Sequence, residues 1–214
     1  LSSSRAVYGE GAWQREDGSV HYPGQRSADQ LAKGEWDFAG SRPLPFQAAR
    51  TQPAPTSIYG STKLAQEHLI TTWALAHGVS TRILRLQNVY GPGQSLSNPY
   101  TGIVSLFVRL AKQHKAIPLY EDGDMTRDFV LIDDVASALL AALEAEQGGF
   151  VLDVGTGVAS SIAQMADVIA QRYGAPAPFV TGQFRNGDVR HAACNIEDTR
   201  ATLAWAPRFD LATG

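Results

Sequence analysis

The feature that most constrains this chain is a tyrosine and a lysine four residues apart at the start of an amphipathic helix. Tyr59 and Lys63 lie in the segment Tyr59-Gly60-Ser61-Thr62-Lys63. Residues at i and i+4 share one face of a helix, so the phenol and the ammonium can reach one site. The residues that follow recur at helical spacing and predict one buried face: Ala65, Leu69, Thr72, Trp73 and Ala76.

This pair has a chemical use. A free tyrosine titrates near pH ~10. A cation held close favours the phenolate, which would let Tyr59 accept a proton near neutral pH. The same spacing also occurs where an ordinary helix begins, so the pair alone leaves a purely structural interpretation open.

Composition limits the classes of partner. A chain of 214 residues with 44% hydrophobic content can bury a sizeable core in one domain or little more. The net charge of -3 gives no basic surface for nucleic acid or anionic lipid. The longest nearly apolar run, residues 135–143, is short of the ~20 residues that span a bilayer. The single cysteine, Cys194, fits a reducing compartment, and we predict a soluble cytoplasmic protein.

Four sequence blocks occur in an order typical of one known family. They are Ser2-Ser3-Ser4-Arg5-Ala6-Val7-Tyr8-Gly9, Tyr59-x-x-x-Lys63, Arg85-Leu86-Gln87-Asn88-Val89-Tyr90-Gly91-Pro92 and the stretch 127–135. Together they resemble the extended short-chain dehydrogenase/reductase family, and within it the NAD-dependent nucleotide-sugar epimerases and dehydratases. The resemblance runs over almost the whole chain. It implies an α/β fold: the C-terminal part of a Rossmann-type doubly wound parallel sheet, with a small α/β substrate-binding domain.

The resemblance also implies a division of the chain. Residues 1–95 are expected to form the C-terminal part of the dinucleotide-binding domain, with a long insertion at 9–55. Residues 96–214 are expected to be mostly the substrate domain, with 126–155 partly returning to the Rossmann sheet. In the family a Gly-rich loop after the first strand holds the cofactor pyrophosphate. This sequence has no such loop, so we expect the C-terminal portion of a longer enzyme, inactive by itself.

The connection from Gly9 to Pro55 is rich in Gly, Pro and charge, and a loop of this length is either functional or partly folded. With segments 22–27 and 97–102, it resembles a subgroup acting as dTDP-rhamnose-type 4-epimerases. Members of that subgroup carry cysteine pairs here that look metal-binding, whereas this loop has no cysteine. The five histidines show no ligand spacing with one another or with Cys194, and we predict no metal.

Local patterns predict the remaining elements. Asp133 is expected to cap a helix, and Ser161 with Gln164 to form a capping box. Gly155-Thr156-Gly157 is either a turn from sheet to helix or a phosphate loop. The expected elements are a strand over 80–86, a helix over 103–114, strands over 117–120 and 127–130 joined as a hairpin, a helix over 134–145, a strand over 150–154 and a helix to residue 173.

The resemblance assigns catalytic and cofactor roles. Tyr59 would take a proton from a sugar hydroxyl, and Ser4 would hydrogen-bond the same oxygen. Lys63 would lower the pKa of Tyr59 and bind the nicotinamide ribose. Tyr59, Lys63, Leu86 and Asn88 are the expected cofactor contacts. The implied cofactor is NAD, with NADP left open.

The resemblance further implies a nucleotide-diphosphate sugar as substrate. The expected substrate contacts are Asn88, Leu119 and Tyr120 near the base, and Arg127, Arg185 and Asp188 near the diphosphate. Guanidinium forks match phosphate oxygens in a bidentate way, and Arg190 is a second candidate cation. Two alternatives stay open: Asn88 caps the turn at 90–93, or Arg127 pairs with Asp124 or Asp128.

The residues after Ser4 bear on the reaction type. In the 4,6-dehydratases an Asp-Glu pair follows the catalytic hydroxyl residue, whereas here Arg5 and Ala6 stand there. Elimination of water then lacks its proton carriers, which favours a 4-epimerase acting through a transient 4-keto sugar. A dehydratase or a keto-sugar reductase is the alternative, and a non-catalytic nucleotide- or partner-binding fragment is the alternative from another class. A homodimer through the helix of Tyr59 is expected.

Overall fold

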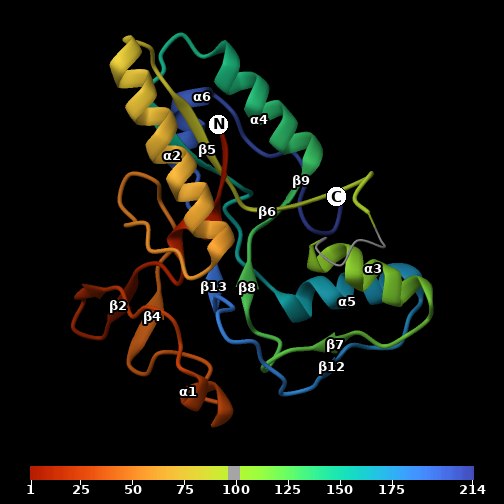
Figure 1. Cartoon of the computed structure of the whole chain (residues 1–214). Coiled ribbons are helices and arrows are strands. Elements are labelled where there is room, and N and C mark those ends of the chain that lie inside the picture. The colour runs from red at the N-terminus through yellow and green to blue at the C-terminus, as the bar shows by residue number, and fades with distance from the viewer. Residues whose placement is uncertain (96–101) are drawn as a thin grey trace.

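The computed structural model describes residues 1–95 and 102–214 (Figure 1). A parallel sheet in the order β1-β5-β10 forms the centre of the molecule. Its strands are β1 (Ser2–Ser4), β5 (Arg82–Leu86) and β10 (Phe150–Val154). Ser4 and Val154 both pair with Leu86, so the three carboxyl ends are level. The expected strands at 80–86 and 150–154 are confirmed.

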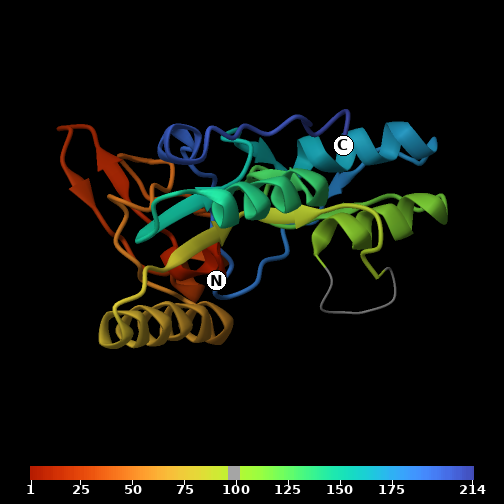
Figure 2. The same cartoon turned by 90° about the horizontal axis from the view of Figure 1, so that it is seen from above.

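Helices lie on both faces of this sheet, as Figure 2 shows. Helix α2 (Ile58–His77) lies on one face and contacts β1, whereas α4 (Ile132–Glu144) and α6 (Glu197–Leu203) lie on the other. The core on the α4 side buries apolar side chains of helix and strands: Leu84, Val130, Val135, Ala138, Leu152 and Leu203. Apolar faces of helices and sheet are buried against each other, which confirms the doubly wound α/β prediction.

The predicted buried face of α2 is wrong. Leu69 and Trp73 are 70% and 53% exposed, whereas Gly60, Glu67 and Ala74 are buried. The reason is the polar surface that α2 meets. Glu67 accepts hydrogen bonds from the Ser3 hydroxyl and from Arg85 on β5, so a carboxylate replaces the expected apolar contact.

Short strands extend the structure beyond the central sheet. β6 (Asn88–Tyr90) pairs in parallel with β9 (Phe129–Leu131). The other short strands are β7 (Pro118–Leu119), β8 (Thr126–Arg127), β11 (Ser160–Ser161), β12 (Phe179–Val180) and β13 (His191–Ala192). β7 pairs with β12, and β8 lies between β11 and β13. The predicted hairpin of 117–120 with 127–130 is therefore wrong, because both segments pair with strands from distant parts of the sequence.

Two helices pack together beside these strands. They are α3 (Ile103–Lys112) and α5 (Ile162–Tyr173). The predicted capping box at the start of α5 is confirmed, since the Ser161 and Gln164 side chains each accept from the other's backbone N–H. The predicted cap of α4 by Asp133 is wrong. That helix begins at Ile132, and the buried Asp134 accepts from the backbone N–H groups of Arg208 and Phe209 instead.

The insertion is folded rather than an open loop. It contains β2 (Trp13–Arg15), β3 (Val20–His21), α1 (Ala28–Ala32) and β4 (Ser41–Pro43). The strands form an antiparallel sheet in the order β3-β2-β4, and Trp13 is fully buried. In Figure 1 the insertion and the α3/α5 pair lie on opposite sides of β8 and β13.

Two of the sequence predictions are not decided by the fold. Residues 97–101, part of the resemblance to the rhamnose-type subgroup, lie outside the described residues. The domain boundary near residue 95 stays a prediction. Of the helices described, none is both long enough and apolar enough to cross a membrane.

Candidate active site

The candidate site begins at the carboxyl ends of β1 and β5, where ligands of open α/β sheets gather. Ser4 ends β1 and Leu86 ends β5. The next residues after Ser4 form a single turn of 3-10 helix, η1 (Arg5–Tyr8). The Ser4 Oγ accepts a hydrogen bond of 3.2 Å from the backbone N–H of Ala6. Both Ser4 and Leu86 are half-buried.

A glycine brings Tyr59 to this edge. A Cβ atom at Gly60 would lie 2.3 Å from the carbonyl oxygen of Ala6, far inside contact distance. Only glycine therefore lets the first turn of α2 pack flush against η1. The Ser57 side chain caps the helix by accepting from the Gly60 N–H at 3.0 Å. Ser4 and Tyr59, 55 residues apart in the sequence, are in this way carried on two elements in direct contact.

Lys63 lies one helical turn behind Tyr59 on the same side. Its Nζ donates to the carbonyl oxygen of Ser2 at 3.1 Å and lies 6.0 Å from the centroid of the Tyr59 ring. The Tyr59 side chain is open to solvent, and its residue is 57% exposed. The structure thus brings together the segments of all three predicted catalytic residues.

Arg5 was not predicted as a site residue. Its Nε donates a hydrogen bond of 2.9 Å to the Oδ1 atom of Asn88, which opens β6. Burial and the neighbouring charge of Arg127 lower the pKa of Arg5 to about 9. The sequence signal for it is an arginine directly after Ser4, where a dehydratase carries a carboxylate. Among the described residues, the Asn88 side chain bonds with Arg5 and not with the turn at 90–93.

Arg127 is a buried cation. Its residue is 8% exposed, and its Nη1 donates to the carbonyl oxygens of Thr126 at 2.7 Å and Arg190 at 3.4 Å. Burial lowers the pKa of Arg127. Within the described part of the chain no carboxylate forms an ion pair with it, so the alternative pairing with Asp124 or Asp128 is wrong. The charges of Asp188, Glu10 and Glu121 act on this guanidinium from beyond ion-pair distance. A desolvated guanidinium without a directly bound carboxylate is costly, which is typical of a site that receives an anion.

The Gly155-Thr156-Gly157 segment is a turn occupied by a side chain of the protein. The backbone N–H groups of Thr156 and Gly157 donate to the Asp128 carboxylate at 2.7 and 2.9 Å. A Cβ at Gly155 would lie 2.4 Å from that carboxylate. The amides that a phosphate would need are already used, so the interpretation as a turn is confirmed.

The residues predicted near the nucleotide form a second group. The guanidinium carbon of Arg185 lies 5.3 Å from the centroid of the Tyr120 ring. Arg185 is exposed, whereas Tyr120 and Asp188 are half-buried. Leu119 is 4% exposed, and its side chain belongs to the core around α3 and α5. Arg185, Tyr120 and Asp188 therefore present side chains at the surface, whereas Leu119 does not.

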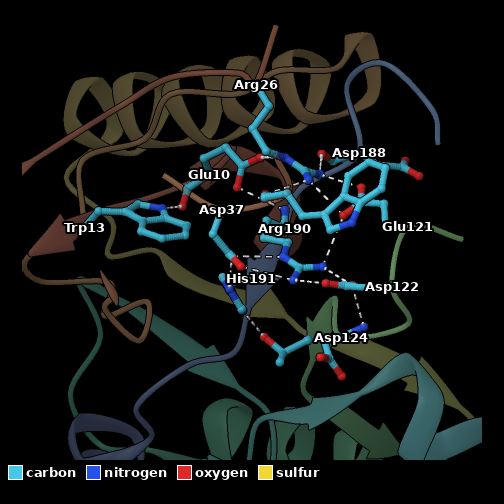
Figure 3. Close-up of polar contacts among 12 residues, drawn as sticks. Glu10, Trp13, Arg26, Asp37, Glu121, Asp122, Asp124, Asp188, Arg190 and His191 are labelled. Carbon is cyan, nitrogen blue, oxygen red and sulfur yellow. Dashed lines mark hydrogen bonds and ion pairs between the residues drawn. The ribbon is translucent and has the colours of Figure 1, made fainter. Parts of the chain in front are cut away.

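Arg190 does not supply a free cation, contrary to the sequence prediction. It belongs to a charged cluster shown in Figure 3, whose members are Glu10, Arg26, Asp37, Glu121, Asp122 and Arg190. All are buried except Asp37, which is exposed, and Asp122, which is half-buried. Its guanidinium donates to Asp122 at 2.7 and 2.8 Å, to Asp37 at 3.0 and 3.2 Å and to Glu121 at 3.2 Å. With three carboxylates around it, this side chain has no donor to spare for a substrate.

A second buried polar network lies behind the site. The Tyr8 hydroxyl donates to both Asp153 carboxylate oxygens at 2.9 and 3.0 Å. Arg85 lies over the Tyr8 ring at 4.8 Å and forms a two-point contact with Glu67. Burial raises the pKa of Asp153 to about 7. In the described ranges, no group of three His, Cys, Asp or Glu side chains could hold a metal ion.

Comparisons with known proteins agree with this geometry. The family model described as NAD dependent epimerase/dehydratase family matches residues 38–155. The dTDP-L-rhamnose 4-epimerase of Burkholderia thailandensis is 60% identical, over the whole of this chain and 59% of that relative.

Solved structures give the same result. The UDP-glucose 4-epimerase of Thermotoga maritima, solved with UDP-glucose, has a TM-score of 0.71 and 30% identity over 76% of this chain and 52% of that one. The UDP-glucuronic acid 4-epimerase of Bacillus cereus, solved with UDP-glucuronic acid and NAD, has a TM-score of 0.72 and 25% identity over 100% of this chain and 57% of that one. The chain thus spans between half and three fifths of the length of these proteins. It belongs to the NAD dependent epimerase/dehydratase family.

Proposed function

We propose that this chain is part of an NAD-dependent nucleotide-sugar 4-epimerase that oxidises its substrate transiently to a 4-keto sugar. The observation that carries the proposal is that the start of α2, with Tyr59 and Lys63, packs on η1 and β1 beside Ser4, through the close approach of Gly60 to Ala6. NADP is not distinguished from NAD by these residues.

The side chains fit the nicotinamide end of the cofactor. An ammonium has three donors, and Lys63 uses two of them, for the Ser2 carbonyl oxygen at 3.1 Å and the Gln66 Oε1 at 3.4 Å. One donor remains for a ribose hydroxyl. The Tyr59 hydroxyl makes no hydrogen bond to any described residue, so it is free to meet a ligand. Leu86 and Asn88 line the same strand ends.

Each catalytic residue has a defined task. The Tyr59 phenolate oxygen accepts the proton of the C4 hydroxyl, and Lys63 stabilises the phenolate. Ser4 donates to the same sugar oxygen and shares its developing charge. NAD, when bound, supplies the hydride acceptor, and the protein supplies orientation and proton transfer. The C4 epimer would form when the keto sugar takes the hydride back on its other face and Tyr59 returns the proton to the C4 oxygen.

Arg5 and Ala6 favour epimerisation over dehydration. Elimination of water needs an acid and a base next to the hydroxyl residue, and neither side chain can serve. Arg5 is instead fixed by Asn88 at 2.9 Å. A keto-sugar reductase uses the same three catalytic residues and stays an alternative, as does a non-catalytic nucleotide- or partner-binding role.

The proposed substrate is a nucleoside-diphosphate 6-deoxysugar, dTDP-L-rhamnose first, because the B. thailandensis relative bears that name at 60% identity. Arg127 and Arg185 would bind the diphosphate oxygens, with Asp188 and Asn88 as polar contacts. Tyr120 and the backbone at Leu119 would face the base. The buried charge of Arg127, which no carboxylate of the described residues binds directly, supports this assignment.

The proposal includes a homodimer in the cytoplasm. Its support is the number of exposed apolar side chains on α2, among which Ile58, Leu69 and Leu75 are 86%, 70% and 79% exposed. Light scattering should give the mass of two chains, and Leu69→Glu should shift it to that of one. A reducing compartment fits the lone thiol of Cys194.

One assay tests the proposed activity. The protein is produced from its complete gene and supplied with NAD and either dTDP-L-rhamnose, UDP-glucose or dTDP-glucose. The products are identified by NMR. The C4 epimer of dTDP-L-rhamnose is expected, at a higher kcat/KM than any product of the other two sugars. A protein that binds these compounds and converts none would support the non-catalytic alternative.

A further inference from the structure

Glu121 combines burial, charge and an unusual backbone. Its residue is 1% exposed, and its φ of 54° lies in the left-handed region that non-glycine residues rarely adopt. Such a conformation is unfavourable for a residue with a Cβ atom and persists only where its surroundings hold it in place. Glu121 directly follows Tyr120, one of the residues proposed to meet the nucleotide.

The contact that holds Glu121 comes from the insertion. Arg26 binds the Glu121 carboxylate in a bidentate way, with Nη1 donating to Oε2 at 2.8 Å and Nη2 donating to Oε1 at 2.9 Å (Figure 3). Arg190 adds a third contact at 3.2 Å. The backbone N–H of Glu121 donates to the carbonyl oxygen of Gln183 at 2.7 Å. The side chain and the backbone of Glu121 are thus both held by hydrogen bonds, and those of the side chain come in part from the insertion.

The same guanidinium also holds the loop that carries Arg185. The Arg26 Nη2 donates to the carbonyl oxygen of Asp188 at 2.9 Å. The Asp188 carboxylate itself makes no hydrogen bond to a described residue and remains available. Tyr120 and Arg185, which flank the two points that Arg26 grips, lie against each other at 5.3 Å. Together with the direct bond from the Glu121 N–H to the Gln183 carbonyl, one buried side chain therefore joins two segments of the proposed substrate site.

The cluster has a simpler interpretation as an ion-pair anchor for the insertion alone. Buried ion pairs contribute little net stability when compared with apolar contacts, so an anchor does not by itself explain four carboxylates and two guanidiniums. Arg26 also donates to the carbonyl oxygen of Trp36 at 3.0 Å, so the bond to the Asp188 carbonyl by itself fits either interpretation. An anchor does not account for the left-handed backbone of Glu121 next to Tyr120. Both features lie where the nucleoside diphosphate is proposed to bind.

We propose that Arg26 is a positioning residue of the nucleotide-sugar site. Acting through Glu121 and the carbonyl of Asp188, it holds Tyr120 and the 185–188 loop at the separation that a nucleoside diphosphate requires. The insertion at 9–55 is then a working part of the substrate site. The inference rests on the proposed function for its choice of ligand.

The test replaces Arg26 by lysine in the naturally encoded protein. Lysine keeps the charge but cannot reproduce the bidentate fork. The Kd for dTDP, measured by calorimetry, and the KM for dTDP-L-rhamnose should rise roughly ten- to hundredfold, the worth of one hydrogen bond to a charged group. The kcat should change less than twofold. Arg42→Lys, in the same insertion but exposed and bound only to Gln14, is the control and should change none of these.

A double variant separates positioning from folding. Arg26→Lys combined with Arg185→Ala should weaken dTDP binding by less than the product of the two single effects, because Arg26 acts through the loop that carries Arg185. Multiplicative effects would overturn the proposal. So would an Arg26→Lys protein with a lowered Tm and an unchanged Kd.

Further measurements cover other failures. If Arg26→Lys does not fold, Glu121→Gln tests the same contact, because it keeps the shape and one acceptor but not the charge. It should raise the Kd for dTDP, and an unchanged Kd would overturn the proposal. If the wild-type protein converts no sugar, the proposed function fails. The positioning role of Arg26 is then tested separately, by comparing the Kd for dTDP of the wild-type and Arg26→Lys proteins.

Discussion

The Nε atom of Arg5 donates a hydrogen bond of 2.9 Å to the Oδ1 atom of Asn88, 83 residues further along the chain. The contact joins the turn after Ser4 to the first residue of β6. It keeps a guanidinium at the position where a dehydratase needs a carboxylate. A cation there cannot give or take the protons of a water elimination, so the contact bears directly on the reaction type.

Tyr59→Phe tests the catalytic base. Loss of the hydroxyl should cut kcat by roughly 10²- to 10⁴-fold, the usual worth of a general acid or base. The Tm should hardly change, because the residue is 57% exposed and its hydroxyl has no partner among the described residues. Tyr173→Phe, at the end of α5, is the matched control. A Tyr59→Phe enzyme with wild-type turnover would show that the base is another group.

Arg127→Ala and Arg185→Ala test the diphosphate contacts. Each should weaken binding of dTDP by about 1.5–3 kcal/mol, the scale of a hydrogen bond to a charged group. Arg127→Ala should also lower the Tm, because the carbonyl oxygens of Thr126 and Arg190 lose a hydrogen-bond donor. Calorimetry measures both, with Arg42→Ala as the control. Unchanged affinity in either variant removes that arginine from the proposed site.

Gly60→Ala tests how α2 is joined to η1. Alanine favours a helix, but its Cβ would meet the Ala6 carbonyl oxygen at 2.3 Å. The two elements must then move apart, and such overpacking costs typically about 1–3 kcal/mol. We expect a lower Tm and a lower kcat, because Ser4 and Tyr59 separate. Ser61→Ala, the exposed neighbour, should change neither. A fully active Gly60→Ala enzyme would show that the close approach is not needed.

Asp153 predicts a pH dependence of stability. Its folded pKa of about 7 exceeds the ordinary value near 3.9, so between these values the folded state keeps a proton that the unfolded chain has lost. The free energy of unfolding should therefore fall as pH rises from about 4 to 7, by up to about 1.4 kcal/mol per pH unit from this group. Urea unfolding across this range measures it.

Asp153→Asn should remove that decline, whereas Asp167→Asn, on the exposed face of α5, should keep it.

Asp37 affects the free energy of unfolding in the opposite direction. Hydrogen bonds from His191 and Arg190 hold its pKa well below the usual range, so its contribution is present above about pH 4 and is lost in acid. For Asp153, the slopes of the free energy of unfolding against pH are compared between pH 4 and 7. Equal slopes for wild type and Asp153→Asn would show that Asp153 is not a buried, protonated carboxyl.

Local signals predicted much of the fold. The strand at Phe150–Val154 and the capping box at Ser161 depend on residues close in sequence, and both are confirmed. The buried face of α2 was mispredicted because its partner surface is polar: Glu67 meets Ser3 and Arg85, and nothing in the helix sequence reveals that.

The candidate site was predicted only in part, for the same reason. The family blocks identified Ser4, Tyr59 and Lys63, and the structure brings their segments together. Arg5 with Asn88, and Arg26 with Glu121, are contacts over 83 and 95 residues. Their partners are set by the tertiary fold, and a single sequence carries no pattern for them. Arg190 was misassigned because its three carboxylate partners lie in two distant segments.

The most direct test of the central claim follows the hydrogen at C4. The naturally encoded protein is incubated in deuterated water with NAD and dTDP-L-rhamnose, and the sugar is examined by mass spectrometry and NMR. The account predicts the C4 epimer without solvent deuterium, because the hydride that leaves C4 returns to it from the cofactor. Deuterium at C4 of the product, or a stable 4-keto-6-deoxy product from dTDP-glucose in the same experiment, would contradict the 4-epimerase mechanism.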